Sequence, residues 1–206
     1  MNQKNDVFDK TYNDYLVELK NTNLPETANT LNLKASGHGF LVSLLDRDYR
    51  VSDAGIFGPD EKRAGFEECI IIFKYLLMCP EEIPTQTDWV AFHSFKNAQP
   101  LLHYFNREIT KPMEEFFSGK LQDLEQASKI LGGIVVTDTA SYDLSIQFTV
   151  LSQVPLYFRF NDTDEDFPAQ CTILFQESVE TFLDMESLGM LGTLFARRLT
   201  ALGKDN

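Results

Sequence analysis

Four carboxylate side chains are crowded into one short segment, at Asp162, Asp164, Glu165 and Asp166. Crowded carboxylates raise the local negative potential, and their oxygens are the ligands that a hard cation such as Ca²⁺ prefers. The spacing matches the start of a calcium-binding loop, but Phe167 and Ile173 stand where such a loop requires Gly and Glu. The segment is therefore not an EF-hand, and we expect at most millimolar-class binding of calcium or manganese. The alternative, a solvated hairpin tip that discourages edge pairing, explains the same residues and is favoured.

Trp89 is the single tryptophan of a chain that also carries 17 Phe and 7 Tyr. Aromatic side chains supply much of the apolar lining of ligand sites, so Trp89 is the candidate pocket aromatic, together with members of the Phe-rich strands. The alternative is that these rings fill the hydrophobic core, and the abundance of Phe favours the core.

The His and Cys residues do not have the spacing of a metal site. A zinc site needs three or four ligands that converge on one ion at about 2.0–2.3 Å. His93 and His103 could line a pocket near Trp89, but no third ligand has a defined spacing from them. Cys69 and Cys79 would lie about 15 Å apart along one predicted helix. We therefore predict no metal centre, and no cofactor can be named from the sequence.

No familiar catalytic motif is present in the sequence. The nucleophile elbow, the phosphate-binding P-loop, the dinucleotide fingerprint, H-E-x-x-H and C-x-x-C are all missing. Gly132 and Gly133 follow a predicted helix and precede a strand, whereas a phosphate-binding turn must lead into a helix. They are expected to end the helix instead. The sequence therefore predicts no reaction and leaves open whether the protein is an enzyme.

The chain is acidic, with 31 Asp and Glu against 18 Lys and Arg and a net charge of −13. Phosphate backbones and anionic membranes are bound by clustered basic residues, so we expect neither nucleic acid nor membrane as a partner.

The first six residues are polar, and the longest apolar run, Cys69 to Phe73, is far shorter than the roughly 18 residues of a membrane span. Three Cys, an odd number, argue against a disulfide framework. These features favour a cytoplasmic protein with a protein partner or a small ligand, and the oligomeric state stays open.

Two periodicities divide the chain into elements. Apolar residues recur every three or four positions in the predicted helices, which cover residues 6–19, 60–79, 100–105, 110–131 and 188–202. They alternate with polar residues in the predicted strands, which cover residues 38–45, 49–52, 89–92, 142–150, 156–160 and 169–175. Strands that follow one another as hairpins indicate antiparallel pairing. We therefore predict an α+β fold, a single domain over residues 1–206 with a mostly antiparallel sheet packed with helices. Residues 1–60 would form an N-terminal helix plus hairpin, and residues 61–206 the main helical and strand region.

Two features of the last predicted helix point to its surroundings. Gly189 and Gly192 each cost roughly 1 kcal/mol relative to Ala inside a helix, so close backbone packing is expected there. Arg197 and Arg198, with Lys204, stand near its carboxyl end, where cations complement the helix dipole. We interpret the two arginines in this way.

A series of short motifs runs through the second half of the chain: Trp89 with Phe92, Pro100-Leu101, Leu131-Gly132-Gly133, Asp143-Leu144-Ser145, Val154-Pro155-Leu156, residues 164–168, Leu174-Phe175 and Met185-Glu186. With these motifs the chain resembles the uncharacterised prokaryotic family numbered 3786 among domains of unknown function. The resemblance implies a bacterial or archaeal cytoplasmic protein, often from anaerobes, and no established activity. Some members carry an added iron–sulfur segment, but this chain has no run of closely spaced Cys to bind a cluster.

Three hypotheses about function follow. The first is a non-catalytic accessory or binding protein that serves a metalloenzyme or cofactor system of anaerobic prokaryotes. The second is a small enzyme whose active-site residues are dispersed along the chain. The third is a protein that binds a divalent cation through the acidic segment at residues 162–166.

Overall fold

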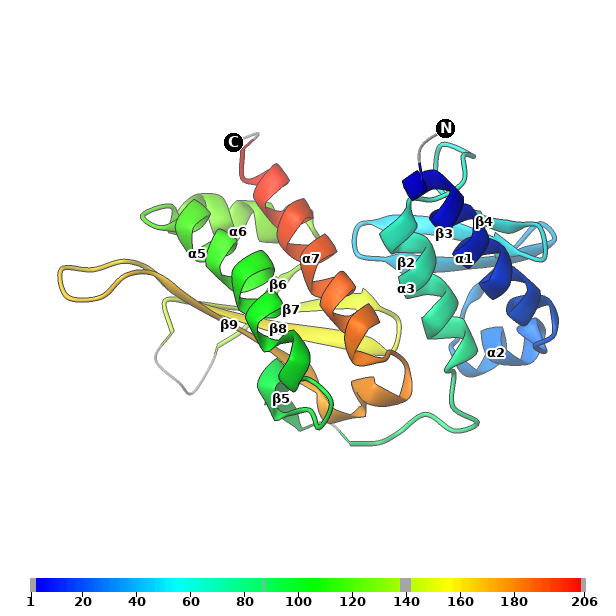
Figure 1. Ribbon diagram of the computed structural model, residues 1–206. Coiled ribbons are helices and arrows are strands. Elements are labelled where there is room, and N and C mark those ends of the chain that lie inside the picture. The colour runs from blue at the N-terminus through cyan, green and yellow to red at the C-terminus, as the bar shows by residue number, and fades with distance from the viewer. Residues whose placement is uncertain (1–2, 87, 138–141, 205–206) are drawn as a thin grey trace.

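The computed structural model describes residues 3–204, except residue 87 and residues 138–141. The strands form two separate antiparallel sheets, and helices pack against each of them (Figure 1). The predicted α+β fold with antiparallel pairing is confirmed. The sequence did not indicate that the strands divide between two sheets.

The first sheet is formed by the N-terminal part of the chain. Its strands pair in sequence order: β1 (Lys34–Ser36), β2 (Gly39–Leu44), β3 (Arg47–Ser52) and β4 (Gly55–Phe57). The helices of this part are α1 (Gln3–Lys20), α2 (Leu24–Thr30) and α3 (Phe66–Leu77). Seven of the twelve residues of α3 are buried, because the helix packs against α1, β2 and the C-terminal helix α7 (Met185–Leu202).

The turn between β2 and β3 differs from the prediction. The polar residues 46–48 were expected to form it, but the turn consists of Leu45 and Asp46, with Leu45 at a φ of 58°. The backbone N–H of Leu45 donates to the carbonyl of Val150 in the second sheet at 2.9 Å. A contact with a distant strand therefore fixes the position of the turn.

The helix predicted to begin at Asp60 begins at Phe66. Residues 58–63 form a loop instead, because Arg63 pairs with Phe57 of β4 as an isolated bridge and Gly58 N–H donates to the Lys62 carbonyl at 2.8 Å. The pairing of Arg63 with β4 therefore prevents these residues from forming the first turns of the predicted helix.

The second sheet has the strand order β5 (Trp89–Ala91), β9 (Gln170–Gln176), β8 (Val154–Asn161), β7 (Leu144–Leu151) and β6 (Ile134–Val135). The alternation predicted for β7, β8 and β9 places large apolar side chains on one face. That face packs on α7, where the Phe195 ring lies 4.9 Å from Phe148 and 6.0 Å from Phe158, centroid to centroid. The helices α5, α6 and α7 lie on this same side of the sheet (Figure 1).

Three short segments are 3₁₀-helical: Phe92–Ser94, Gln99–Leu101 and Glu177–Thr181. The remaining α-helices are α4 (Leu102–Phe105), α5 (Lys111–Phe117) and α6 (Leu121–Ile130). A π-helical turn, Asn106–Thr110, connects α4 to α5. The π turn directly precedes Pro112, which lacks the N–H that an α-helix requires, and Lys111 N–H donates instead to the carbonyl of Asn106. The helix predicted over residues 110–131 is interrupted at Gly119, which has a φ of +71°. Gly provides this left-handed conformation without steric cost.

Polar contacts join the helical part of the N-terminal region to the β7–β8 turn of the second sheet. The Tyr75 hydroxyl of α3 lies 2.7 Å from the Ser152 hydroxyl, which donates to the Leu31 carbonyl at 3.0 Å. The Gln153 N–H donates to the same Tyr75 oxygen at 3.2 Å. Burial raises the pKa of Tyr75 to about 12, so its phenol is neutral at physiological pH.

The two glycines of α7 differ in what surrounds them. A methyl group at Gly192 would lie 2.8 Å from Cδ1 of Ile109 and 3.3 Å from the Phe105 ring, whereas the nearest atom to one at Gly189 is 3.7 Å away. Close packing therefore explains Gly192 but not Gly189.

We predict opposite effects of alanine at these two positions. Gly189→Ala should raise the free energy of unfolding by about 0.5–1 kcal/mol through helix propensity. Gly192→Ala should lower it by about 1 kcal/mol, because overpacking exceeds the propensity gain. Urea denaturation of the two variants checks this, and a stabilised Gly192→Ala protein would contradict the packing of α7 on the π turn.

Candidate functional site

One face of the second sheet has no helix on it among the described residues. The side chains that point away from α7 include Gln147 and Thr149 of β7, and both are exposed. Pairing places Tyr157 and Arg159 of β8 on the same face, because Tyr157 lies opposite Gln147 and Arg159 lies opposite Ser145, two residues before Gln147. We call this surface the open face.

Trp89 lies on the open face and reaches across the neighbouring strand. It is paired with Gln176 of β9, and β8 is the next strand beyond β9. Backbones two strands apart are separated by about 9–10 Å, yet the indole and Tyr157 ring centroids are only 5.4 Å apart. The indole therefore extends over β9, where Leu174 is buried.

Arg159 extends this row of side chains in contact. Its guanidinium carbon lies 4.6 Å from the Tyr157 ring centroid and 5.1 Å from that of Tyr142. Trp89, Tyr157, Arg159 and Tyr142 therefore form a continuous array across the sheet, which we call the aromatic array. Contacts between a cation and aromatic faces hold such side chains in defined conformations.

The aromatic array is part of a pleated surface, and its residues line none of four cavities of about 420–530 Å³ elsewhere on the described chain. Small-molecule sites are concave and enclose most of the ligand. A flat surface rich in Trp, Tyr and Arg has instead the composition of protein–protein contact sites. The geometry of Trp89 thus suits a protein partner better than a small ligand.

The acidic segment lies in the connection between β8 and β9, and its carboxylates are directed to different partners. Oδ1 of Asp162 accepts from Gly119 N–H at 2.6 Å and Thr163 N–H at 2.7 Å. Oδ1 of Asp164 accepts from Asp166 N–H at 2.8 Å and Phe167 N–H at 2.7 Å. The side chains of Glu165 and Asp166 are exposed. Within the described residues, no group of three or more His, Cys, Asp or Glu is arranged to hold a metal ion.

We predict that the acidic residues differ in their effect on stability. Asp162→Asn should lower the free energy of unfolding by about 1–2 kcal/mol, because it weakens charge-assisted hydrogen bonds that join this loop to the end of α5. Glu165→Gln should change it by less than about 0.5 kcal/mol. Thermal unfolding with and without millimolar calcium measures both. Equal effects of the two substitutions would contradict the structural role of Asp162.

The cysteines and histidines occupy separate places. Cys69 is buried and its thiol donates to the Ala64 carbonyl at 3.3 Å, while Cys79 lies beyond the end of α3. Burial raises the pKa of Cys69 to about 12 and also raises the pKa of Cys171, so both thiols are protonated at neutral pH. His93 and His103 are exposed.

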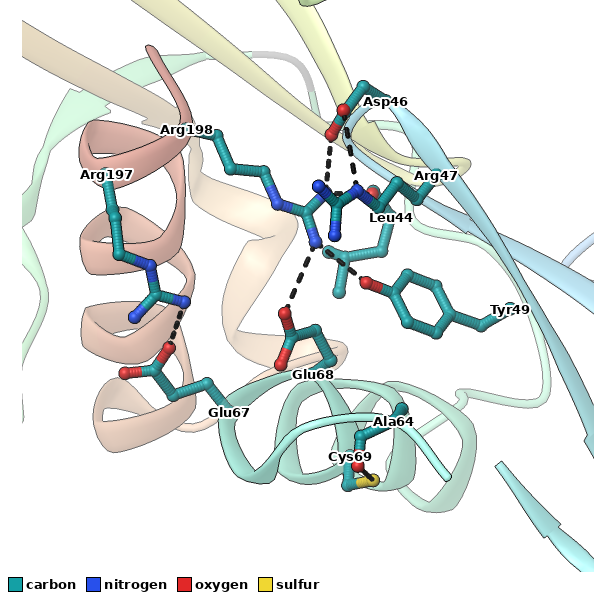
Figure 2. Close-up of polar contacts among 10 residues, drawn as sticks. All are labelled: Leu44, Asp46, Arg47, Tyr49, Ala64, Glu67, Glu68, Cys69, Arg197 and Arg198. Atoms are coloured by element: carbon teal, nitrogen blue, oxygen red, sulfur yellow. Dashed lines mark hydrogen bonds and ion pairs between the residues drawn. The ribbon is translucent and has the colours of Figure 1, made fainter. Parts of the chain in front are cut away.

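Arg198 was interpreted as a cation that complements the dipole of its helix, but the structure directs its guanidinium to residues outside α7. Its side chain is only 8% exposed and lies between α7 and the first sheet (Figure 2). Nη1 donates to the Leu44 carbonyl at 3.0 Å and to Asp46 at 2.6 Å. Nη2 donates to the Tyr49 hydroxyl at 2.8 Å and to Glu68 at 3.5 Å. Arg197, in contrast, is exposed and pairs with Glu67 at 2.6 Å.

The Arg198 network has a structural role rather than a chemical one. Burial raises the pKa of Tyr49, an effect that the nearby guanidinium opposes, so the phenol is neutral and accepts a hydrogen bond from Arg198. The guanidinium binds the β2–β3 turn, β3 and α3 at once and thereby holds α7 on the first sheet. The sequence could have indicated that Arg198 is buried, because it stands seven residues after Leu191 and three after Phe195, on the predicted apolar face of the helix.

A family model described as a domain of unknown function, DUF3786, matches residues 23–198. The chain belongs to this family. The resemblance inferred from the short motifs is therefore confirmed. The DUF3786 match includes both sheets, every member of the aromatic array and Arg198 itself. No curated protein and no solved structure matches the chain.

No helix among the described residues is long and apolar enough to cross a membrane.

Proposed function

We propose that this protein is a non-catalytic accessory protein of the prokaryotic cytoplasm, which binds a partner protein through the open face of its second sheet. The aromatic array is the observation that carries the proposal. Trp, Tyr and Arg dominate the residues whose loss weakens protein complexes most. Here Trp89, Tyr142 and Arg159 are half-buried and surround Tyr157, which is only 7% exposed, on a sheet face on which no helix of the described chain packs.

The contacts within the array add a second argument. Trp89 and Arg159 are already in contact with Tyr157 in the isolated chain, the indole at an interplanar angle of 56° to the Tyr157 ring. Side chains that are ordered before binding lose less conformational entropy when the complex forms, so more of the contact energy appears as affinity. The array is therefore preorganised for a partner.

The partner we propose belongs to a metalloenzyme or cofactor system of anaerobic prokaryotes. This part of the proposal rests on the family, some members of which carry an added iron–sulfur segment. Elemental analysis and absorption spectroscopy of the purified complex test it. A complex without metal or chromophore would contradict the association with a metalloenzyme or cofactor system, but it would not contradict the binding of a partner protein.

Photo-cross-linking in the native host tests the binding role. A benzophenone amino acid placed at Gln147, exposed on the open face, should capture one dominant partner protein. The same group at Gln126, exposed on α6, is the matched control and should not capture it. A second substitution, Thr149→Glu, should abolish capture from position 147 without unfolding the chain, because Thr149 is exposed on the same face. Equal capture from positions 147 and 126, or none from 147, would contradict the proposal.

A further inference from the structure

A cleft runs between β9 and the helical segment that comprises the π turn and α5. It consists of two adjoining cavities of about 420 and 500 Å³. The cavities share Glu114, Cys171 and Thr172 in their walls, so they form one continuous cleft.

The cleft is long and narrow. Its strand wall extends from Pro168 to Ile173, about 17 Å at the rise of an extended chain. Its helical wall extends from Asn106 to Ser118, about 18 Å at the rise of an α-helix. Walls of this length match an extended peptide of five or six residues, and a small molecule would leave most of the cleft empty.

The lining offers the groups that bind a peptide. Phe92 and Phe105 stack at a centroid distance of 4.2 Å and line one end of the cleft, where they are 3% and 6% exposed. Asn106 near that end and Gln170 toward the other are exposed carboxamides, which both donate and accept hydrogen bonds as a peptide group does.

The charge of the cleft is negative toward the end of α5. Glu114 and Glu115 line it there, with Lys111 as the basic lining residue. The acidic segment at residues 162–166 ends two residues before Pro168, and the hydrogen bond between Asp162 and Gly119 holds it beside the end of α5. This charge distribution complements a basic partner.

We propose that this cleft binds an extended basic peptide segment of a protein, with an apolar side chain on the Phe92–Phe105 pair and a Lys or Arg side chain beside Glu115. Glu114 contributes negative charge, but one of its carboxylate oxygens already has a partner, because Oε1 accepts from Cys171 N–H at 3.0 Å. The cleft borders the open face at Thr172, which pairs with Arg159. A substitution on β7, remote from this border, distinguishes the two sites.

Fluorescence anisotropy with two labelled hexapeptide pools tests the proposal. Both pools carry Leu at position 2 and are degenerate elsewhere, except that positions 4 and 5 are Lys in one pool and Glu in the other. The Lys pool should bind at least about tenfold more tightly than the Glu pool at low salt, and this preference should shrink as ionic strength rises.

Variants at exposed positions locate the binding. Asn106→Trp should block the cleft and weaken binding of the Lys pool at least about tenfold, while Gln126→Trp should not change it. Glu115→Lys should remove the preference for Lys over Glu. Thr149→Glu, on the open face, should leave the binding unchanged. Equal binding of the two pools, no binding at millimolar protein, or loss of binding in Thr149→Glu but not in Asn106→Trp would overturn the proposal.

Discussion

Arg198→Ala should lower the free energy of unfolding by about 3–5 kcal/mol, because loss of one partner leaves the other charges of a buried pair uncompensated. Asp46 and Glu68 are 30% and 15% exposed, so neither regains full hydration when the guanidinium is removed. The Leu44 carbonyl and the Tyr49 hydroxyl lose their donor as well. Urea denaturation measures the effect.

Arg197→Ala is the matched control, since it removes the neighbouring arginine of the same helix. Arg197 is 56% exposed, so its ion pair with Glu67 should contribute less than about 1 kcal/mol. Glu68→Gln in an Arg198→Met background should recover part of the lost stability by removing a stranded charge. Equal losses for Arg197→Ala and Arg198→Ala would show that Arg198 does not hold α7 on the first sheet.

Phe195→Ala should destabilise the protein by a similar amount, about 3–5 kcal/mol, because it opens a cavity in the core between α7 and the second sheet. The Phe195 side chain is fully buried and contacts the rings of Phe148 and Phe158. Calorimetry should show a lower unfolding temperature.

Phe167→Ala provides the comparison with an exposed ring. Phe167 is 66% exposed in the β8–β9 connection, so its removal should change stability by less than about 0.5 kcal/mol. If Phe195→Ala were as mild as Phe167→Ala, the placement of α7 on the apolar face of the sheet would be wrong.

The sequence predicted those elements whose periodicity extends over several residues. Alternation over residues 142–150 identified β7, which the structure places at Leu144–Leu151, and helical spacing over residues 188–202 identified α7. The strands β1, β4 and β6 were missed because two or three residues carry too little periodicity to detect.

The candidate sites depended on contacts between distant residues, which a single sequence does not reveal. Trp89 was singled out as an aromatic that could bind, but the sequence could not show that all nearby helices pack on the opposite side of its sheet. Arg198 was missed because its partners Asp46 and Glu68 lie far away in the sequence. The sequence placed the four acidic residues in a hairpin connection, but it could not predict the hydrogen bond that Gly119 N–H donates to Asp162.

Hydroxyl-radical footprinting tests the central claim, that the open face binds a partner, and it does so even while the identity of that partner is unknown. Oxidation of Trp89 and Tyr142 is compared between the purified chain and the same chain in cells of its native host. Tyr104 and Phe116, partly exposed on the helical side, serve as internal references. We predict that Trp89 and Tyr142 are oxidised in the purified protein and protected several-fold in cells, while the two references do not change. Equal oxidation of Trp89 in both settings, or protection of Tyr104 and Phe116 instead, would contradict the account.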